Sequence, residues 1–390
     1  MKELFDTYAG RDNGVFWLKS VLTPKELLDA GKRGFSGAEF EFPTCPAFSR
    51  GVAEAARNGL FGYTLAGDSY RERVRWWMKQ VRGFDIDPEW IVTTHGTIFT
   101  LATLIRMLTG PEQGIIILPP CYNRYQQAAD RLGRPTAKVP LVREDGRYAI
   151  DLPALEKAMA DPKNRILVLT NPNNPTGTVF PAETLRAVMA LADRYDVTVY
   201  SDEIFAEVIP GGTRVPCLCE VSQSAHCVTA TGMGKVFSLT GVNHANVLIP
   251  DAGLRERFIK QRNADHYGSL DPMVHAGLLS AYTREGADWV AGLNAYIRDN
   301  AALVCDTLHD LWPDIRADRP EGTFVLWVDY AAAGLTRAEL EPLLTRACFV
   351  GDWGEEYYGS DTCMRYSLAL PRKEIADTLE LLKKTVREMK

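Results

Sequence analysis

The stretch Asn171-Pro172-Asn173-Asn174-Pro175-Thr176-Gly177 decides the fold of this chain, and it follows directly on an apolar run that ends at Thr170. Asn, Pro and Gly favour turns, but a turn needs only about two to four such residues. Here the loop has seven residues without a break, and all except Thr176 are Asn, Pro or Gly. Two X-Pro bonds in one short loop are candidates for cis geometry, which holds a backbone rigid. We therefore predict a rigid loop that presents an amide side chain at the end of a buried strand.

Strands and helices alternate on both sides of this loop. Apolar residues in unbroken runs are typical of strands that are buried on both faces of a sheet. The predicted strands are Trp90–Thr94, Gly114–Pro119, Arg165–Asn171, Thr198–Asp202, Cys227–Ala230 and Ala245–Ile249. The predicted helices between them are Gly96–Thr109, Tyr122–Leu132, Pro181–Tyr195 and Asp251–Ala264. This alternation predicts an α/β fold with a doubly wound, largely parallel sheet.

The two ends of the chain differ from its middle. Residues 1–50 are irregular, with Pro43 and Pro46 close together. The last hundred residues predict a smaller α+β domain, built from the helices Asp288–Trp312, Arg337–Arg346 and Lys373–Met389 and the strands Thr323–Tyr330 and Cys363–Ala369. We therefore expect a large domain over residues 51–285 and a small domain over residues 286–390, which the segment 1–50 joins.

Composition excludes several classes of protein. The chain has 390 residues, of which 46% are hydrophobic and 24% charged, and its formal net charge is -6. It has no cluster of basic residues of the kind that binds nucleic acid. It also has no run of the roughly 18–20 apolar residues that a membrane helix needs. The eight cysteines show no metal-binding spacing, and Cys217-x-Cys219 stands alone. We expect no metal site, and reduced thiols in a cytoplasmic protein.

Polar residues at three other strand ends are candidates for chemistry, because ligands of open α/β sheets bind beyond the carboxyl ends of the strands. Asp202 could be a counterion, but a carboxylate at that position could equally cap a helix. Lys235 lies between glycines and apolar residues, so it could be a desolvated amine that forms a Schiff base, or a surface lysine. The sequence from Thr93 to Ile98 could bind phosphate at a helix N-terminus, although many helices begin this way without a ligand.

Taken together, these residues resemble the fold-type-I pyridoxal-phosphate (PLP) enzymes, the class I/II aminotransferase superfamily. The resemblance rests on Asn171–Gly177, on Ser201-Asp202-Glu203-Ile204, on Lys235 and on Arg365 in Met364-Arg365-Tyr366-Ser367-Leu368. It implies a mostly parallel seven-stranded sheet in a three-layer large domain.

One branch of the superfamily is favoured. Leu60-Phe61-Gly62-Tyr63-Thr64 and Ala38-Glu39-Phe40-Glu41-Phe42-Pro43 resemble the cystathionine β-lyase-like C–S lyases. Asn243, eight residues after Lys235, supports this branch, because many aminotransferases have a phosphate-binding arginine there.

The resemblance also implies a role for each matching residue toward PLP. Lys235 would form the Schiff base with the cofactor and later move the proton at the substrate Cα. Asp202 would pair with the protonated ring nitrogen, which keeps the ring an electron sink. The remaining cofactor contacts would come from Asn174 at the phenolic oxygen, Tyr122 on the ring face, and the backbone of Gly96, Thr97 and Ile98 at the phosphate.

Further implied roles concern the substrate and a second subunit. Arg365 would bind the substrate carboxylate with two parallel hydrogen bonds. The backbone near Ala38 would cover the same carboxylate, and Asn174 would lie beside it. Tyr63 would reach the phosphate of the neighbouring subunit, so a homodimer with active sites at the subunit interface is expected.

Some residues depart from the superfamily pattern. Phe205 stands where related enzymes commonly have a tyrosine near the phenolic oxygen, and phenylalanine cannot donate a hydrogen bond. Gly232 and Gly234 replace the hydroxyl residues that usually flank the lysine. His244 could line the site or be a packed or solvated histidine.

The resemblance predicts a PLP-dependent C–S β-lyase that cleaves L-cystathionine or another cysteine S-conjugate to thiol, pyruvate and ammonia. The alternative is an amino acid aminotransferase on the same scaffold, since both reactions use the same core residues. A regulatory or binding protein that uses this fold is the third hypothesis.

Overall fold

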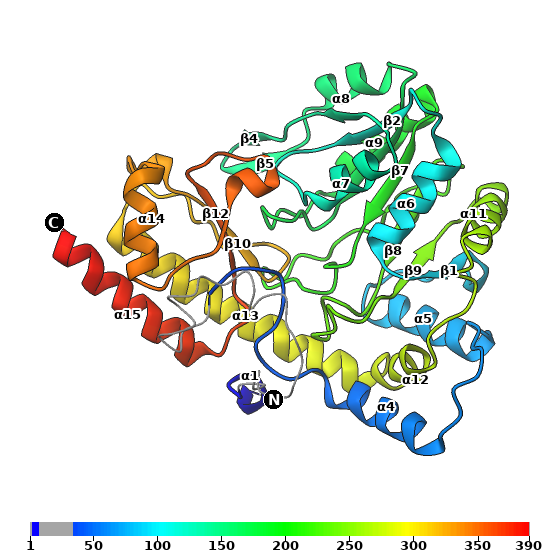
Figure 1. Cartoon of the computed structure of the whole chain (residues 1–390), viewed down its shortest axis with the longest axis horizontal. Coiled ribbons are helices and arrows are strands. Elements are labelled where there is room, and N and C mark those ends of the chain that lie inside the picture. Colours follow the sequence, from blue (N-terminus) through cyan, green and yellow to red (C-terminus); the bar gives the residue numbers. More distant parts are fainter. Residues whose placement is uncertain (1, 8–33, 390) are drawn as a thin grey trace.

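A seven-stranded sheet forms the centre of the computed structural model, which describes residues 2–7 and 34–389 (Figure 1). Its strands run in the order β1 (Ile91–Thr94), β9 (Ala245–Leu248), β8 (Cys227–Thr231), β7 (Thr198–Asp202), β6 (Asn164–Thr170), β2 (Gly114–Ile117) and β3 (Thr136–Lys138). β9 is antiparallel to both of its neighbours, and the other pairs are parallel. The predicted α/β fold with a mostly parallel seven-stranded sheet is confirmed.

Helices cover both faces of this sheet, because side chains alternate between the two faces of a strand. On one face, Ile115, Ile117 and Val168 pack with residues of α6 (Thr97–Leu108), α7 (Arg124–Arg131) and α11 (Ala252–Ala264). On the other face, Ile116 and Leu167 pack with residues of α8 (Leu152–Met159), α9 (Ala182–Tyr195) and α10 (Leu218–Val221). The large domain therefore has the three layers that the resemblance implied.

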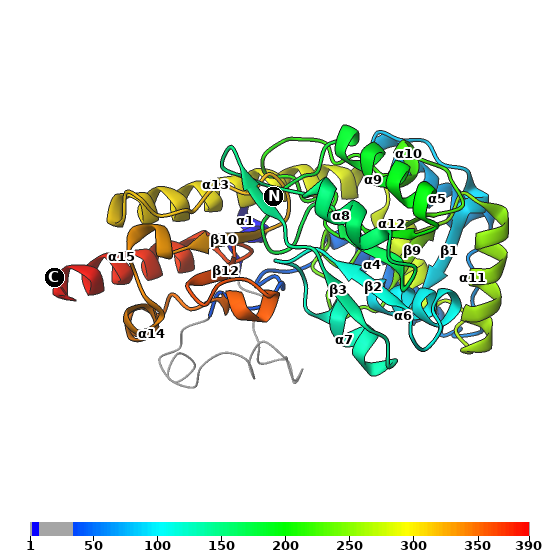
Figure 2. The ribbon, with the colours of Figure 1, turned by 90° about the horizontal axis from the view of Figure 1, so that it is seen from above.

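A second, smaller sheet lies beside the large domain (Figure 2). It has the antiparallel order β10 (Val325–Asp329), β12 (Cys363–Ser367) and β11 (Asp352–Trp353). The helices α14 (Arg337–Arg346) and α15 (Arg372–Met389) belong to the same part of the chain. The long helix α13 (Arg284–Leu311) connects the two parts, and it begins four residues before the predicted start at Asp288.

The described part of the N-terminal segment contacts this smaller sheet. The Phe35 N–H donates to the Val350 carbonyl at 2.8 Å, and the Ser367 N–H donates to the Phe35 carbonyl at 2.7 Å. Residues 8–33 of the segment lie outside the described residues. The three-part division at residues 50 and 285 stays a prediction.

Several elements were not predicted from the sequence. They are α1 (Lys2–Phe5), α4 (Pro46–Asn58), α5 (Asp68–Gln80), α8, α10, α12 (Pro272–Ala281), β3, β11 and the two-stranded sheet of β4 (Val142–Glu144) and β5 (Arg147–Ala149). The predicted strand at Trp90 begins one residue too early, because Pro88–Trp90 forms a 3-10 turn. Within residues 2–7 and 34–389, no helix is long and apolar enough to cross a membrane.

Candidate active site

A cavity of about 420 Å³ opens where the smaller sheet meets the carboxyl ends of the large one. Most of the residues that the sequence singled out line it: Ala38, Gly96, Thr97, Ile98, Tyr122, Asn174, Asp202, Phe205, Lys235 and Arg365. They come from segments that are far apart along the chain. The fold thus brings together residues whose proximity the sequence alone could not show.

Lys235 lies on the wall of this cavity, just after β8. Its Nζ donates to the Ala38 carbonyl oxygen at 2.8 Å, and the Thr240 hydroxyl lies at 3.4 Å. Burial and the neighbouring Arg365 charge lower the pKa of the Lys235 amine to about 8. About a tenth of this amine is therefore unprotonated at pH 7, far more than for an ordinary lysine, and the unprotonated amine is the nucleophile.

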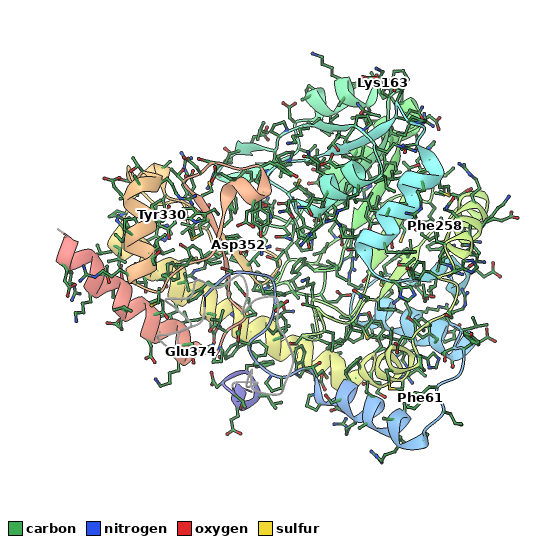
Figure 3. The ribbon with its side chains drawn as sticks, in the orientation of Figure 1. Phe61, Lys163, Phe258, Tyr330, Asp352 and Glu374 are labelled. Carbon is green, nitrogen blue, oxygen red and sulfur yellow. The ribbon has the colours of Figure 1, made fainter. Side chains whose placement is uncertain are left out.

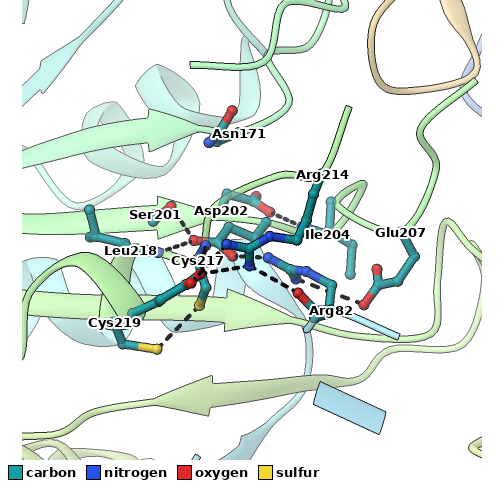
Figure 4. Close-up of polar contacts among 12 residues, drawn as sticks. Arg82, Asn171, Ser201, Asp202, Ile204, Glu207, Arg214, Cys217, Leu218 and Cys219 are labelled. Carbon is teal, nitrogen blue, oxygen red and sulfur yellow. Dashed lines mark hydrogen bonds and ion pairs between the residues drawn. The ribbon is translucent and has the colours of Figure 1, made fainter. Parts of the chain in front are cut away.

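Asp202 is the last residue of β7 and lies at the floor of the cavity. The side chains of Asp202 and Glu203 make contacts in different directions. Asp202 Oδ2 accepts a hydrogen bond from the Tyr125 hydroxyl at 3.0 Å, and Oδ1 accepts one from the Ile204 N–H at 3.2 Å. Complete burial raises the pKa of Asp202 to about 6. Glu203 instead binds the buried Arg82 guanidinium at 2.5 Å and the Leu218 N–H at 2.8 Å, in the network that Figure 4 shows. Glu203 fixes the strand end behind the site, while Asp202 faces the cavity.

The loop after β6 reaches the cavity through Asn174. The Asn171–Pro172 and Asn174–Pro175 peptide bonds are both cis, as the sequence suggested. Asn174 Oδ1 accepts a hydrogen bond from Arg365 Nη1 at 2.9 Å. The amide nitrogen of Asn174 is therefore the group left to donate within the cavity.

The N-terminus of α6 forms another wall. No side chain caps it, and the first N–H groups of a helix have no partner within the helix. Gly96 precedes the helix with φ 106° and ψ 168°, a conformation that is essentially restricted to glycine. Tyr200 fixes this turn, because its buried hydroxyl donates to the Thr97 carbonyl at 2.7 Å. The free N–H groups and the helix dipole make this wall suited to a phosphate.

Arg365 and Asp352 form an ion pair at the opposite wall, on neighbouring strands of the smaller sheet. Arg365 Nε and Nη2 donate to Asp352 Oδ2 at 3.1 and 2.5 Å. Asp352 lies between the two parts of the molecule (Figure 3), and it also accepts from the Gly37 N–H at 3.0 Å. Of the five N–H donors of a guanidinium, three are used by Asp352 and Asn174, so two remain for a substrate carboxylate.

Comparison with known proteins now identifies the family. The model of a family described as aminotransferase class I and II matches residues 33–382, most of the chain. The chain belongs to this family. The family resemblance predicted from the sequence is thereby confirmed.

The chain is also similar to individual proteins of known name or structure. The chain is 27% identical over 350 residues to cystathionine β-lyase PatB of Bacillus subtilis. This alignment covers 89% of this chain and 90% of that protein. It is 26% identical over 345 residues to the cystathionine β-lyase of Corynebacterium glutamicum, covering 88% and 90%. Cystalysin from Treponema denticola, whose crystal structure contains a PLP cofactor, superposes with a TM-score of 0.92, 28% identity and 99% coverage of both chains.

The cavity fits the cofactor of this enzyme family. PLP carries a phosphate, a ring nitrogen that is protonated in such sites, and an aldehyde that reacts with an amine. The uncapped start of α6, the buried Asp202 carboxylate and the buried Lys235 amine match these three groups. Gly96 leaves open space, since a side chain there would meet no atom within 4 Å.

The remaining residues that the sequence singled out occupy different places. Tyr63 lies outside the cavity and is fully exposed. Asn243 and Gly234 line the cavity, whereas a side chain at Gly232 would meet the His244 carbonyl oxygen at 3.0 Å. His244 lines the cavity as a buried residue whose Nε2 lies 2.7 Å from the Tyr70 hydroxyl. Burial and His95 lower the pKa of His244 to about 4, so its ring is neutral at physiological pH.

Sequence reasoning missed Tyr125, Thr240 and the ion pair between Asp352 and Arg365. Tyr125 carries a weak signal, because it follows Tyr122 by only three residues. Asp352 and Thr240 have no motif, and their contacts arise only when distant segments meet.

Proposed function

We propose that this protein is a PLP-dependent C–S β-lyase that cleaves L-cystathionine or another cysteine S-conjugate to thiol, pyruvate and ammonia. The observation that carries the proposal is that Lys235, Asp202 and Arg365 line one cavity, where they supply an amine, a carboxylate and a guanidinium. The similarity to two cystathionine β-lyases favours the lyase over the aminotransferase reaction.

Each residue has a distinct task in this proposal. When bound, PLP supplies the electron sink that stabilises negative charge at the substrate Cα. Lys235 would hold the cofactor covalently, and its amine, whose pKa is lowered, would take the Cα proton. Asp202 would hold a proton at the ring nitrogen. Arg365 binds the substrate carboxylate with its two remaining donors and thereby orients the Cα–H bond toward Lys235.

The predicted homodimer is part of this proposal. Leu60, Phe61 and Leu65 are large apolar side chains that stand exposed beside Tyr63, and contiguous apolar surface of this kind marks an interface. Phe61 lies at the edge of the molecule (Figure 3). We assign this segment to the contact with a second copy of the chain, where Tyr63 would reach the partner's phosphate.

We also keep the cytoplasm as the proposed location. Cys217 and Cys219 are free thiols, although their sulfur atoms lie 3.2 Å apart. Free thiols this close together suit a reducing compartment.

A single assay separates the two candidate reactions. The purified protein loaded with PLP is mixed with L-cystathionine and no keto acid, and we expect pyruvate, ammonia and free thiol in equal amounts. Lys235→Ala is the matched control and should reduce the rate by several orders of magnitude. Conversion of the cofactor to its amine form without pyruvate, with turnover only after a keto acid is added, would instead make the protein an aminotransferase.

A further inference from the structure

We propose that Tyr125 is a positioning residue that keeps the Asp202 carboxylate ionised and aimed at the ring nitrogen of the cofactor. This inference rests on the function proposed above, because it assumes that PLP binds in the cavity. The hydrogen bonds that the fold creates around Asp202 give Tyr125 this role.

Tyr125 stands in a chain of three hydroxyl and carboxyl groups with a defined direction. Its oxygen lies 3.0 Å from Asp202 Oδ2 and 2.9 Å from the Thr170 hydroxyl. A phenol has one hydrogen, and an ionised carboxylate can only accept, so Tyr125 must donate to Asp202. Thr170 then donates to Tyr125. Each donor in such a chain polarises the next and strengthens its hydrogen bond.

The hydrogen bonds also leave Asp202 free toward the cavity. Tyr125 occupies one lone pair of Oδ2, and the Ile204 N–H occupies one of Oδ1. The Thr97 hydroxyl also bonds to this carboxylate. Since an ionised carboxylate has about four acceptor positions, one remains for a ligand. Two donors on opposite oxygens also fix the rotation of the carboxylate plane.

Position within the fold explains how Tyr125 reaches this point. It is the second residue of α7, and it is almost completely buried. Its ring meets Tyr122 edge to face, with the ring centroids 5.6 Å apart. The Tyr125 N–H donates to the Tyr122 carbonyl at 3.3 Å, and this turn at the start of α7 places both side chains at the cavity.

The other charged and titratable groups that face Asp202 do not outweigh the effect of its burial. Lys235 attracts the carboxylate from across the cavity, the Thr97 hydroxyl stabilises it, and Tyr200 on the same strand is a neutral phenol. Burial opposes ionisation more strongly than any of these groups favours it. The Tyr125 hydrogen bond offsets part of this effect, and it favours the ion pair with the proton on the ring nitrogen rather than on Asp202.

Tyr125→Phe tests this role, because it removes the hydroxyl and keeps the ring. We expect the midpoint for Asp202 ionisation to rise by about one pH unit, the scale of a lost hydrogen bond to a charged group. The dissociation constant of PLP is measured by equilibrium dialysis against cofactor-free protein between pH 5.5 and 8.5. The ratio of the variant to the parent value should approach one at pH 8.5 and rise to about fivefold near pH 6 and about eightfold at pH 5.5. In the assay described above, kcat should fall while KM stays nearly unchanged.

Two further variants keep the result decisive. Thr170→Val removes the donor to Tyr125, so it should shift the midpoint in the same direction by a smaller amount, even if Tyr125→Phe fails to fold. Tyr330→Phe is the control, because Tyr330 is a buried phenol of the smaller sheet that bonds to the Tyr366 hydroxyl outside the cavity. It should leave the pH profile unchanged.

The outcomes separate this inference from the proposed function. A ratio that is constant across the pH range in both Tyr125→Phe and Thr170→Val would overturn the role of Tyr125. A parent protein that binds no PLP at any pH would overturn the proposed function as well.

Discussion

The burial of the Asp202 carboxyl group lowers the stability of the folded protein at neutral pH. Among the described residues no cation lies within 4 Å of it, and burial raises its pKa from 3.8 to about 6. The folded chain therefore holds a proton between pH 4 and 6 that the unfolded chain has lost. It follows that the free energy of unfolding decreases as the pH rises through this window.

Replacing this acid should stabilise the protein that lacks cofactor. We expect Asp202→Asn to raise the free energy of unfolding by about 2–3 kcal/mol at pH 7.5, with no gain at pH 4. Urea denaturation of cofactor-free parent and variant at the two pH values measures this difference. An equal gain at both pH values would show that the ionisation of Asp202 is not the cause.

Phe205 stands where related enzymes commonly have a tyrosine near the phenolic oxygen of PLP. Its side chain therefore offers no hydroxyl group to that oxygen. Its buried ring packs against Phe324 with 5.3 Å between centroids, and Lys235 Nζ lies 5.8 Å from its centre. We expect Phe205→Tyr to lower the pKa of the Schiff base at Lys235, because the added donor stabilises the deprotonated form. A pH titration of the cofactor absorbance measures this pKa. Phe205→Leu adds no donor and should not lower it, and a rise in Phe205→Tyr would contradict the prediction.

The turn before α6 positions the backbone N–H groups that we assign to the phosphate of PLP. Gly96 has a backbone conformation that costs other residues about 1–3 kcal/mol, although a side chain there would meet no atom. We expect Gly96→Ala to weaken PLP binding by about tenfold or more, because the relaxed turn would misplace the Thr97 and Ile98 N–H groups. The cofactor dissociation constant measures the effect.

A neighbouring glycine supplies the comparison for this variant. Gly110 lies at the other end of α6, where a side chain would meet only Gln113 at 3.7 Å. Gly110→Ala should leave PLP affinity unchanged. Equal losses in the two variants would argue against a special role of the Gly96 turn.

The elements also show what the sequence could predict. The strands β6 to β9 were found because they are buried on both faces and therefore rich in apolar residues. The strands β3, β4 and β5 were missed because three residues are too few to show a period. In the site, motifs pointed to Lys235 and Asp202. Tyr125 and Asp352 act through tertiary contacts, which the order of residues does not encode locally.

At the scale of the whole molecule, the exposed segment around Tyr63 predicts a test for shared active sites. In the proposed dimer, a complete site needs Lys235 from one subunit and Tyr63 from the other. Tyr63→Ala and Lys235→Ala proteins should each have little activity. Mixed after unfolding and refolding together, they should recover about a quarter of the wild-type activity, the share of intact sites when two subunits pair at random.

Two controls test whether the recovered activity comes from sites shared between two subunits. Refolding each variant alone should give no recovery. Mixing Lys235→Ala with Asp202→Asn should also give none, because both residues belong to the same site of one subunit. Recovery in that control, or none in the Tyr63 mixture, would contradict a site shared across subunits.

The contacts of Lys235 and Arg365 also bear on how the protein is made. Lys235 bonds to Ala38, which lies 197 residues earlier in the chain, and Arg365 bonds to Asn174, which lies 191 residues earlier. Domains generally fold in order as the chain leaves the ribosome. The large sheet can assemble during synthesis, but the wall that carries Arg365 joins it only when translation is nearly complete. A truncated product of translation would therefore have the lysine without the residue that orients its substrate.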